Sequence, residues 1–193
     1  MEDSSQSQPW TLLPSWMSTI ESERWQRQIK ENLFWKQPLI RVYGSSYLVP
    51  RKTTFLAEKN ICYRYSGLTN YGLGLPDWFH PLLDKVILEC QAQFNGCLLN
   101  LYRNGDDRMG WHSDDEPEID RTKPIASLSL GATRDFFFKH RTKKIREVLT
   151  LKQGDLLIMH PNCQKNWLHS VPIRKKIAHE RINLTFRCYF EDD

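Results

Sequence analysis

Short stretches of alternating apolar and polar residues run through most of this chain, and they restrict it to a mainly β architecture. Gly, Pro, Asn or Asp bounds each stretch, which is typical of strands joined by turns. The predicted strands are 39–43, 47–49, 61–65, 97–103, 125–130, 135–139, 148–151, 155–159 and 181–190. This many short strands indicate a β-sandwich or a jelly roll.

Two segments have a helical period instead. After Ser22, which we expect to cap a helix, Trp25, Ile29 and Leu33 follow one another at four-residue spacing. The second predicted helix covers residues 77–94. Its apolar stripe comprises Phe79, Leu83, Ile87 and Cys90. We therefore expect an α+β, mainly β fold, in which early helices support the β-sandwich or jelly roll.

The composition is that of a folded domain without a membrane span. Of the 193 residues, 40% are hydrophobic and 26% charged, which excludes a disordered chain. The apolar run at 156–159 is far shorter than the roughly 20 residues that span a bilayer. Residues 1–15 are polar and contain Pro9 and Pro14, so we expect a mobile arm followed by one domain over 16–193.

Cysteine usage and the first residues predict the compartment. The five cysteines show no Cys-x-x-Cys spacing, which argues against a zinc ribbon or a disulfide framework. The first residues include Glu2 and Asp3, and no apolar stretch of a secretion signal follows them. We expect a reducing compartment: the cytoplasm of a bacterium or the nucleus of a eukaryote.

Charge is unevenly distributed along the chain. Seven acids accompany only Arg108 between residues 106 and 120, whereas thirteen bases accompany four acids between 134 and 187. An acidic cluster suits a hard cation, and a basic tract suits a polyanion such as nucleic acid. Two ordinary solvated faces are the alternative.

A His-x-Asp pattern is the first sign of chemistry. If His112 lies on a strand, Asp114 projects from the same face and both can reach one ion. His169 is the best-placed third ligand among the remaining histidines. Two His and one carboxylate are the ligand set of non-haem Fe(II) oxygenases, although a single His-x-Asp pair also occurs by chance.

The segment 181–187 strengthens this interpretation. Arg181, Asn183, Thr185 and Arg187 alternate with apolar residues, so one face of the strand carries two cations and an amide. Two Arg flanking an Asn can bind a small dicarboxylate. Asn100 and Tyr102 share a face of another predicted strand and could bind the same ligand. An edge strand facing water would also alternate.

Together these residues resemble the AlkB family of Fe(II)- and 2-oxoglutarate-dependent dioxygenases, in the region from about Leu39 to Arg187. Further segments resemble in particular the branch that repairs duplex DNA. They are Val42-Tyr43-Gly44, Val49-Pro50-Arg51-Lys52, Tyr65-Ser66-Gly67-Leu68-Thr69, Pro124-Ile125-Ala126-Ser127, Gly131-Ala132-x-Arg134-Asp135-Phe136 and His169-Ser170-x-Pro172-x-Arg174-Lys175-Lys176. The resemblance implies a nucleotide-recognition hairpin region with a supporting helix over about 39–96. It implies a catalytic core over about 97–190 that is a double-stranded β-helix (jelly roll).

The resemblance also implies roles at the reaction centre. His112, Asp114 and His169 would hold Fe(II). Arg181 and Tyr102 would bind the distal carboxylate of 2-oxoglutarate, and Arg187, Asn100 and Asn183 the end nearer the metal. With O2, such a site would oxidise an N-methyl group of a damaged base and release formaldehyde, succinate and CO2.

The implied substrate is a base flipped out of duplex DNA. Tyr65 and Ser66 would contact the base, with Tyr65 stacked on one face and His112 on the other. Asp115 and Glu116 would read its edge or its exocyclic amine. Tyr43, at the predicted hairpin tip, would fill the vacated space; packing on the protein's own core is the alternative.

Basic residues near these motifs are candidates for phosphate contacts. They are Arg51, Lys52, Arg174, Lys175 and Lys176, with a second basic tract over 139–146. Solvated loops are the alternative. We expect a monomer that repairs alkylated, double-stranded DNA; the other functions considered are an RNA demethylase, a protein hydroxylase and a catalytically silent nucleic-acid-binding module.

Overall fold

The computed structural model describes residues 8–42, 45–65 and 68–191, without the side chains of residues 40–42, 65 and 68. The strands are β1 (Trp10–Leu13), β2 (Leu39–Val42), β3 (Ser45–Leu48), β4 (Lys52–Ala57), β5 (Cys62–Tyr65), β6 (Leu68–Tyr71), β7 (Gly96–Tyr102), β8 (Met109–His112), β9 (Ile125–Gly131), β10 (Arg134–His140), β11 (Arg146–Leu151), β12 (Leu156–Met159), β13 (Trp167–Val171) and β14 (Arg181–Arg187). The helices are α1 (Thr19–Asn32), α2 (His80–Cys90), which follows a 3₁₀ turn at Asp77–Phe79, and α3 (Pro161–Asn166).

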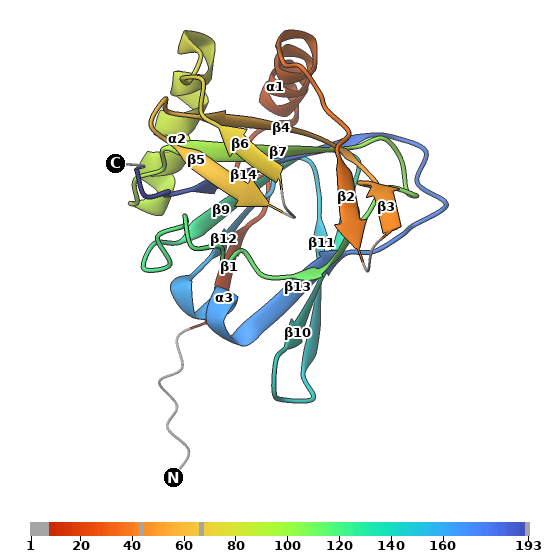
Figure 1. Ribbon diagram of the computed structural model, residues 1–193. Helices are drawn as coiled ribbons and strands as arrows, with labels where there is room; N and C mark the ends of the chain where they lie inside the picture. Colours follow the sequence, from red (N-terminus) through yellow and green to blue (C-terminus); the bar gives the residue numbers. More distant parts are fainter. Residues whose placement is uncertain (1–7, 43–44, 66–67, 192–193) are drawn as a thin grey trace.

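Two antiparallel sheets form a jelly roll (Figure 1). The larger sheet has the order β1-β12-β9-β14-β7-β4, and the smaller has the order β11-β10-β13-β8. Two separate hairpins, β2-β3 and β5-β6, complete the strands of the described residues. Each of the predicted strands overlaps an observed one, so the mainly β fold class is confirmed.

The alternation in β14 explains how the two layers meet. Ile182, Leu184 and Phe186 point to a core that includes Trp25 and Ile29 of α1. The core cluster on the other side of the larger sheet draws residues from both sheets. It comprises Tyr102, Ile125, Phe136, Phe138, Leu151, Leu157, Met159, Cys163 and Val171. The polar positions of β14 therefore project between the sheets, where the whole strand is buried.

Part of the predicted mobile arm is an ordered strand. β1 pairs with β12 in antiparallel register, Trp10 with Met159 and Leu13 with Leu156. Trp10 also stacks on Phe138 with ring centroids 3.9 Å apart. The prediction of a mobile arm is therefore wrong for Trp10–Leu13, because the aromatic ring finds a partner in the smaller sheet.

Both predicted helices exist with shifted ends. Ser18, and not Ser22, caps α1: its hydroxyl accepts a hydrogen bond from the backbone N–H of Glu21, whereas Ser22 is buried inside the helix. The second helix stops at Cys90 because Gln91 takes a left-handed conformation with φ of 49°.

Five strands and one helix have no counterpart among the predicted elements: β1, β4, β6, β8, β13 and α3. β4 pairs with β7 in the larger sheet, although it lies within the segment predicted for nucleotide recognition; the division near residue 96 stays a prediction. No helix in the described ranges is long and apolar enough to cross a bilayer.

Candidate functional site

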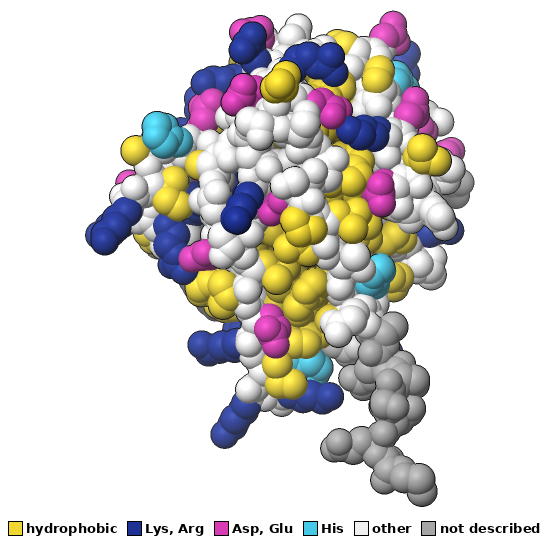
Figure 2. Space-filling model, turned by 180° about the vertical axis from the view of Figure 1, so that it is seen from behind, with side chains coloured by type: hydrophobic (Ala, Val, Ile, Leu, Met, Phe, Trp, Pro, Cys, Tyr) yellow, Lys and Arg dark blue, Asp and Glu magenta, His cyan; other side chains and the backbone are white. Residues whose placement is uncertain are grey.

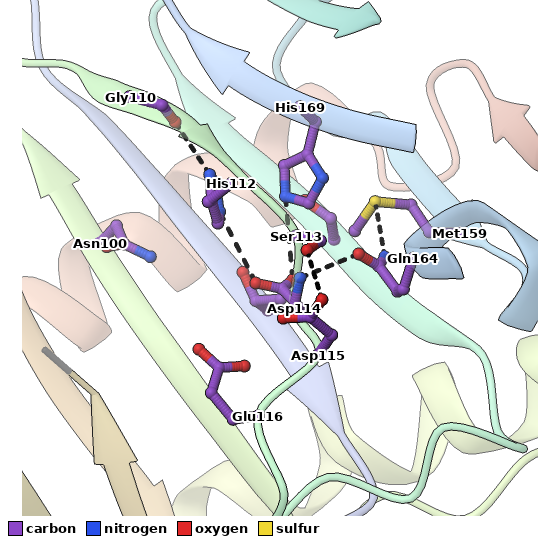
Figure 3. Close-up of polar contacts among 12 residues, drawn as sticks. Asn100, Gly110, His112, Ser113, Asp114, Asp115, Glu116, Met159, Gln164 and His169 are labelled. Carbon is purple, nitrogen blue, oxygen red and sulfur yellow. Dashed lines mark hydrogen bonds and ion pairs between the residues drawn. The ribbon is translucent and has the colours of Figure 1, made fainter. Parts of the chain in front are cut away.

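The three predicted metal ligands lie together on the inner side of the smaller sheet. β8 and β13 are neighbours, and His112 pairs directly with His169. Nε2 of His112 is 3.6 Å from Oδ1 of Asp114, and Nε2 of His169 is 3.9 Å from Oδ2 (Figure 3). All three ligand atoms lie within 4.8 Å of one another. One ion can therefore contact all three residues.

The two imidazoles are held in the form that binds metal. Nδ1 of His112 lies 2.9 Å from the carbonyl oxygen of Gly110. This nitrogen therefore carries the proton, and the lone pair of Nε2 faces Asp114. Burial lowers the pKa of His112, and burial together with the nearby His112 ring lowers the pKa of His169 to about 3. Both rings are neutral at pH 7, as coordination requires.

Asp114 is ionised because of an arginine from the other sheet. Its carboxylate is 2.9 Å from an Nη atom of Arg187, and both side chains are 4% exposed. Burial alone would raise the pKa of Asp114, but the charge of Arg187, with smaller contributions from His169 and His112 when they are protonated in acid, outweighs it and lowers the pKa well below its usual range. Arg187 also donates to the hydroxyl of Tyr189 at 3.1 Å.

Arg181 lies deeper between the sheets with unused donors. It is 1% exposed and donates to the hydroxyl of Ser129 at 2.9 Å. Its Nε and Nη1 atoms find no hydrogen-bond partner within the described ranges. Burial lowers its pKa to about 10, so the side chain remains a cation at pH 7. A buried cation with two unsatisfied donor nitrogens is suited to an anionic ligand.

One pocket between the sheets joins these groups. Its polar lining comprises Tyr63, Asn100, Tyr102, His112, Asp114, Ser127, His169, Asn183, Thr185 and Arg187. Tyr102 connects this pocket to Arg181, whose guanidinium carbon is 5.5 Å from the ring centroid. The metal-ligand triad and Arg187 thus line one cavity, and Arg181 contacts its lining residue Tyr102.

The two asparagines of the pocket are already hydrogen-bonded. Asn183 donates to the hydroxyl of Ser127 at 2.8 Å and to the carbonyl of Leu128 at 3.2 Å, and it accepts from Thr185 at 3.1 Å. Asn100 accepts from Nε of Arg51 at 2.6 Å. Asn183 therefore ties β14 to β9, and direct contact of either amide with 2-oxoglutarate stays a prediction.

Two carboxylates follow the metal ligand. Asp115 is exposed, and its carboxylate accepts from Ser113 at 2.8 Å and from Arg141 at 3.0 Å. Glu116 is half-buried and accepts from the hydroxyl of Tyr63 at 3.1 Å. Burial, with the nearby Asp114 charge, raises the pKa of Glu116. This loop can therefore present two carboxyl groups, one exposed and one half-buried, beside the metal site.

Comparison with known proteins identifies the family. Residues 9–187 match the model of the 2OG-Fe(II) oxygenase superfamily. The chain belongs to this superfamily. The solved structure of OsALKBH1 has the same fold, with a TM-score of 0.67, 18% identity, and coverage of 94% of this chain and 98% of that one. A 2OG-Fe(II) oxygenase family oxidoreductase from Burkholderia pseudomallei also aligns, with a TM-score of 0.62, 14% identity, and coverage of 93% and 84% of the two chains.

Sequence relatives place the chain among the AlkB homologues. The mouse DNA oxidative demethylase ALKBH2 is 41% identical over 160 residues, which cover 77% of this chain and 65% of that protein. Human ALKBH2 is 38% identical over 160 residues, covering 77% and 60%. Human alpha-ketoglutarate-dependent dioxygenase alkB homolog 3 is 35% identical over 194 residues, covering 94% and 66%. The chain thus spans about two thirds or less of the lengths of these relatives.

The residues present fit the Fe(II) and 2-oxoglutarate of this superfamily. His112, Asp114 and His169 form a nitrogen and oxygen ligand set for the iron. The unsatisfied donors of Arg181 are suited to a carboxylate of 2-oxoglutarate. When bound, iron and 2-oxoglutarate together with O2 supply the oxidising power for attack on a substrate C–H bond. The chain contributes ligand orientation, a buried cation and exclusion of water.

Arg51, which was predicted to contact the DNA backbone, lies at the site. It is 3% exposed, and its Nε donates to Asn100. This hydrogen bond supports the position of Asn100. Contact of Arg51 with a phosphate stays a prediction.

The other predicted phosphate contacts lie nearer the surface. Lys175 and Lys176 are exposed, and Lys52 is half-buried. Arg174 is partly exposed and forms an ion pair with Asp135 at 2.5 Å. Its loop is held against Gly105, where a Cβ atom would overlap the carbonyl oxygen of Arg174. Phosphate binding by these residues stays a prediction.

The predicted residues Tyr43 and Ser66 lie outside the described residues, as does the side chain of Tyr65. Tyr63, Gln164 and Tyr189 were not predicted, although all three contact the metal loop or its arginine. Tyr63 could have been found from its position two residues before Tyr65, which puts both on one face of a strand. Gln164 has no local signal, because it acts through a contact fifty residues away.

Proposed function

We propose that this chain is a DNA repair dioxygenase that demethylates N-alkylated bases of the 1-methyladenine and 3-methylcytosine type. The proposal includes Fe(II), 2-oxoglutarate and O2 as cofactor and cosubstrates, and formaldehyde, succinate and CO2 as products. Relatives named as DNA oxidative demethylases support it. The observation that carries it is the position of Asp115 and Glu116 directly after the metal ligand Asp114.

These two carboxyl groups suit the edge of such a base. Methylation at a ring nitrogen of adenine or cytosine gives the base a positive charge, and the exocyclic amine remains a donor. An exposed Asp115 carboxylate and a Glu116 held by Tyr63 offer acceptors for that amine close to the iron ligands. His112 would contact the face of the same base.

Surface features support nucleic acid as the substrate. The hairpin β2-β3 exposes Leu39, Tyr47 and Leu48, whose exposed fractions are 59%, 56% and 57%. Apolar groups on a protruding hairpin are suited to insertion between bases. The second basic tract lies at the β10-β11 hairpin. There a hollow is lined by Lys139, His140, Lys143, Lys144 and Arg146.

Phosphate contacts from this basic group, and from Lys52, Lys175 and Lys176, would fix the register of a duplex. Figure 2 shows Lys and Arg side chains projecting from the lower end of the molecule. We further propose that the protein acts as a monomer where DNA is kept, in the bacterial cytoplasm or the eukaryotic nucleus.

The test compares one methylated sequence in three forms. Purified protein with Fe(II), 2-oxoglutarate and ascorbate is incubated with 1-methyladenine in duplex DNA, single-stranded DNA and RNA, and the bases are measured by mass spectrometry. We expect the duplex to be demethylated, with His169→Ala as the inactive control. Conversion of 2-oxoglutarate to succinate without loss of methyl from any strand would overturn the proposal. Loss from RNA alone would establish an RNA demethylase instead.

A further inference from the structure

The metal ligand Asp114 lies beyond the end of its strand. β8 ends at His112, so the sheet ladder no longer holds the backbone that carries the carboxylate. The N–H of Asp114 is buried and donates to Oε1 of Gln164 at 2.9 Å (Figure 3). A side chain from another part of the chain therefore replaces the missing ladder bond.

Gln164 is itself held in one orientation. It is 6% exposed, and its Nε2 faces the Sδ atom of Met159 at 3.5 Å. Only the amide oxygen can accept from the N–H of Asp114, so a flipped amide would set two donors against each other. Its backbone carbonyl also accepts from Arg141 at 3.4 Å. The acceptor is thus fixed before any metal binds.

The position of Gln164 links two metal ligands. It belongs to α3, which passes directly into β13, the strand that carries His169. Arg187 holds the Asp114 carboxylate from the larger sheet, whereas Gln164 holds the Asp114 backbone from the side of the smaller sheet. The two contacts together fix the position of the Asp114 backbone and the direction in which its carboxylate points.

We propose that Gln164 is a positioning residue that holds Asp114 in the geometry required for metal binding. Loss of its acceptor would leave the Asp114 N–H buried without a partner and would free the loop to shift. Removing groups that orient metal ligands typically weakens metal affinity by 10- to 100-fold. The inference concerns the metal site and holds whether or not DNA is the substrate.

The experiment measures Co²⁺ binding by the metal-free protein from its absorption spectrum, without nucleic acid. Gln164→Met retains the length of the side chain and removes the acceptor, so the Co²⁺ dissociation constant should rise about 10- to 100-fold. Gln164→Glu retains an acceptor oxygen and should stay within about threefold of the native protein. Lys165→Met, an exposed position on the same helix, is the control for damage to α3 and should leave the constant unchanged.

A second measurement needs no variant. Hydrogen exchange at the Asp114 amide of the native, metal-free protein should be much slower than at the amide of an exposed loop residue such as Lys175. Fast exchange at Asp114 would overturn the proposal even if Gln164→Met failed to fold. A folded Gln164→Met protein with native Co²⁺ affinity, or equal losses for Gln164→Met and Gln164→Glu, would overturn it as well.

Discussion

Arg187 donates to Asp114 across 2.9 Å in the interior of the protein. From the sequence, Arg187 was predicted to bind 2-oxoglutarate and Asp114 to bind the metal. The ion pair connects the two predictions, because one guanidinium lies beside a predicted metal ligand and also lines the pocket between the sheets. The arginine therefore stabilises the charge of the metal-free site.

Replacing Arg187 should destabilise the metal-free protein. Arg187→Met leaves the Asp114 carboxylate buried without its cation, a change that typically costs about 3–5 kcal/mol. Urea unfolding at pH 7 measures the loss, and Arg187→Lys should lose less because it keeps a positive charge. A loss below about 1 kcal/mol for Arg187→Met would mean that water or the two histidines compensate the carboxylate.

The three metal ligands should each be indispensable for turnover. His112→Ala, Asp114→Ala and His169→Ala each remove a ligand, so the remaining two hold the ion weakly and without a fixed orientation. Demethylation, measured by mass spectrometry of the bases, should fall to the background of a metal-free reaction, while DNA binding in a mobility-shift assay should largely survive. Near-native turnover by any one variant would remove that residue from the metal site.

Arg181 should determine the affinity for 2-oxoglutarate. Its buried, planar guanidinium still has unsatisfied donors on Nε and Nη1 and can bind a carboxylate through a pair of N–H groups, a geometry that a Lys ammonium cannot reproduce. We expect Arg181→Lys to raise the apparent constant for 2-oxoglutarate by about 10- to 100-fold, since hydrogen bonds to charged groups contribute roughly 1.5–3 kcal/mol. Co²⁺ affinity serves as the control and should not change. An unchanged constant for 2-oxoglutarate would place its carboxylate elsewhere.

Local sequence patterns predicted some of these features correctly and could not predict others. The alternation of β14 correctly assigned Arg181 and Arg187 to one face, because a strand has a fixed two-residue period. Alternation does not say whether a face meets water or another sheet. The position of Arg51 near the predicted hairpin likewise did not show that its side chain is buried. Gln164 and β1 depend on partners distant in the sequence, and a local pattern contains no information about them.

A structural ion pair outside the metal site should give stability that depends on pH. Arg103 donates to Asp107 through its backbone N–H, Nε and Nη2, at 2.9, 2.8 and 2.7 Å. Burial alone would raise the pKa of Asp107, but the bonds from Arg103 outweigh it and lower the pKa. Ionised Asp107 therefore stabilises the fold above the ordinary Asp range near pH 4, and this stability is lost as the pH falls.

Asp107→Asn should accordingly cost roughly 1–3 kcal/mol at pH 7, and the cost should shrink toward pH 3. Urea unfolding of both proteins at pH 7, 5 and 3 follows this difference. Asp106→Asn, at the exposed neighbouring position, is the matched control and should show little loss at any of these values. A cost for Asp107→Asn that is constant with pH would show that packing, and not charge, is responsible.

Tyr43 should matter for duplex DNA more than for single strands. Flipping a base out of a duplex costs a few kcal/mol, and most of this cost is absent in a single strand. If the Tyr43 ring fills the vacated space, Tyr43→Ala should slow repair of methylated duplex at least about tenfold more than repair of the same base in a single strand. The ratio of the two initial rates is the measurement. Equal losses on both substrates would assign Tyr43 to packing.

The central place of β14 in the larger sheet also affects when the protein can fold during synthesis. β14 lies between β9 and β7, yet it is the last strand in chain order. A nascent chain that has not reached Arg181 holds β1-β12-β9 and β7-β4 as two fragments with no strand to join them. Folding of the larger sheet must therefore wait until these seven residues have left the ribosome, and the same residues bring Arg181 and Arg187 to the site. A truncated chain would lose the fold and the chemistry together.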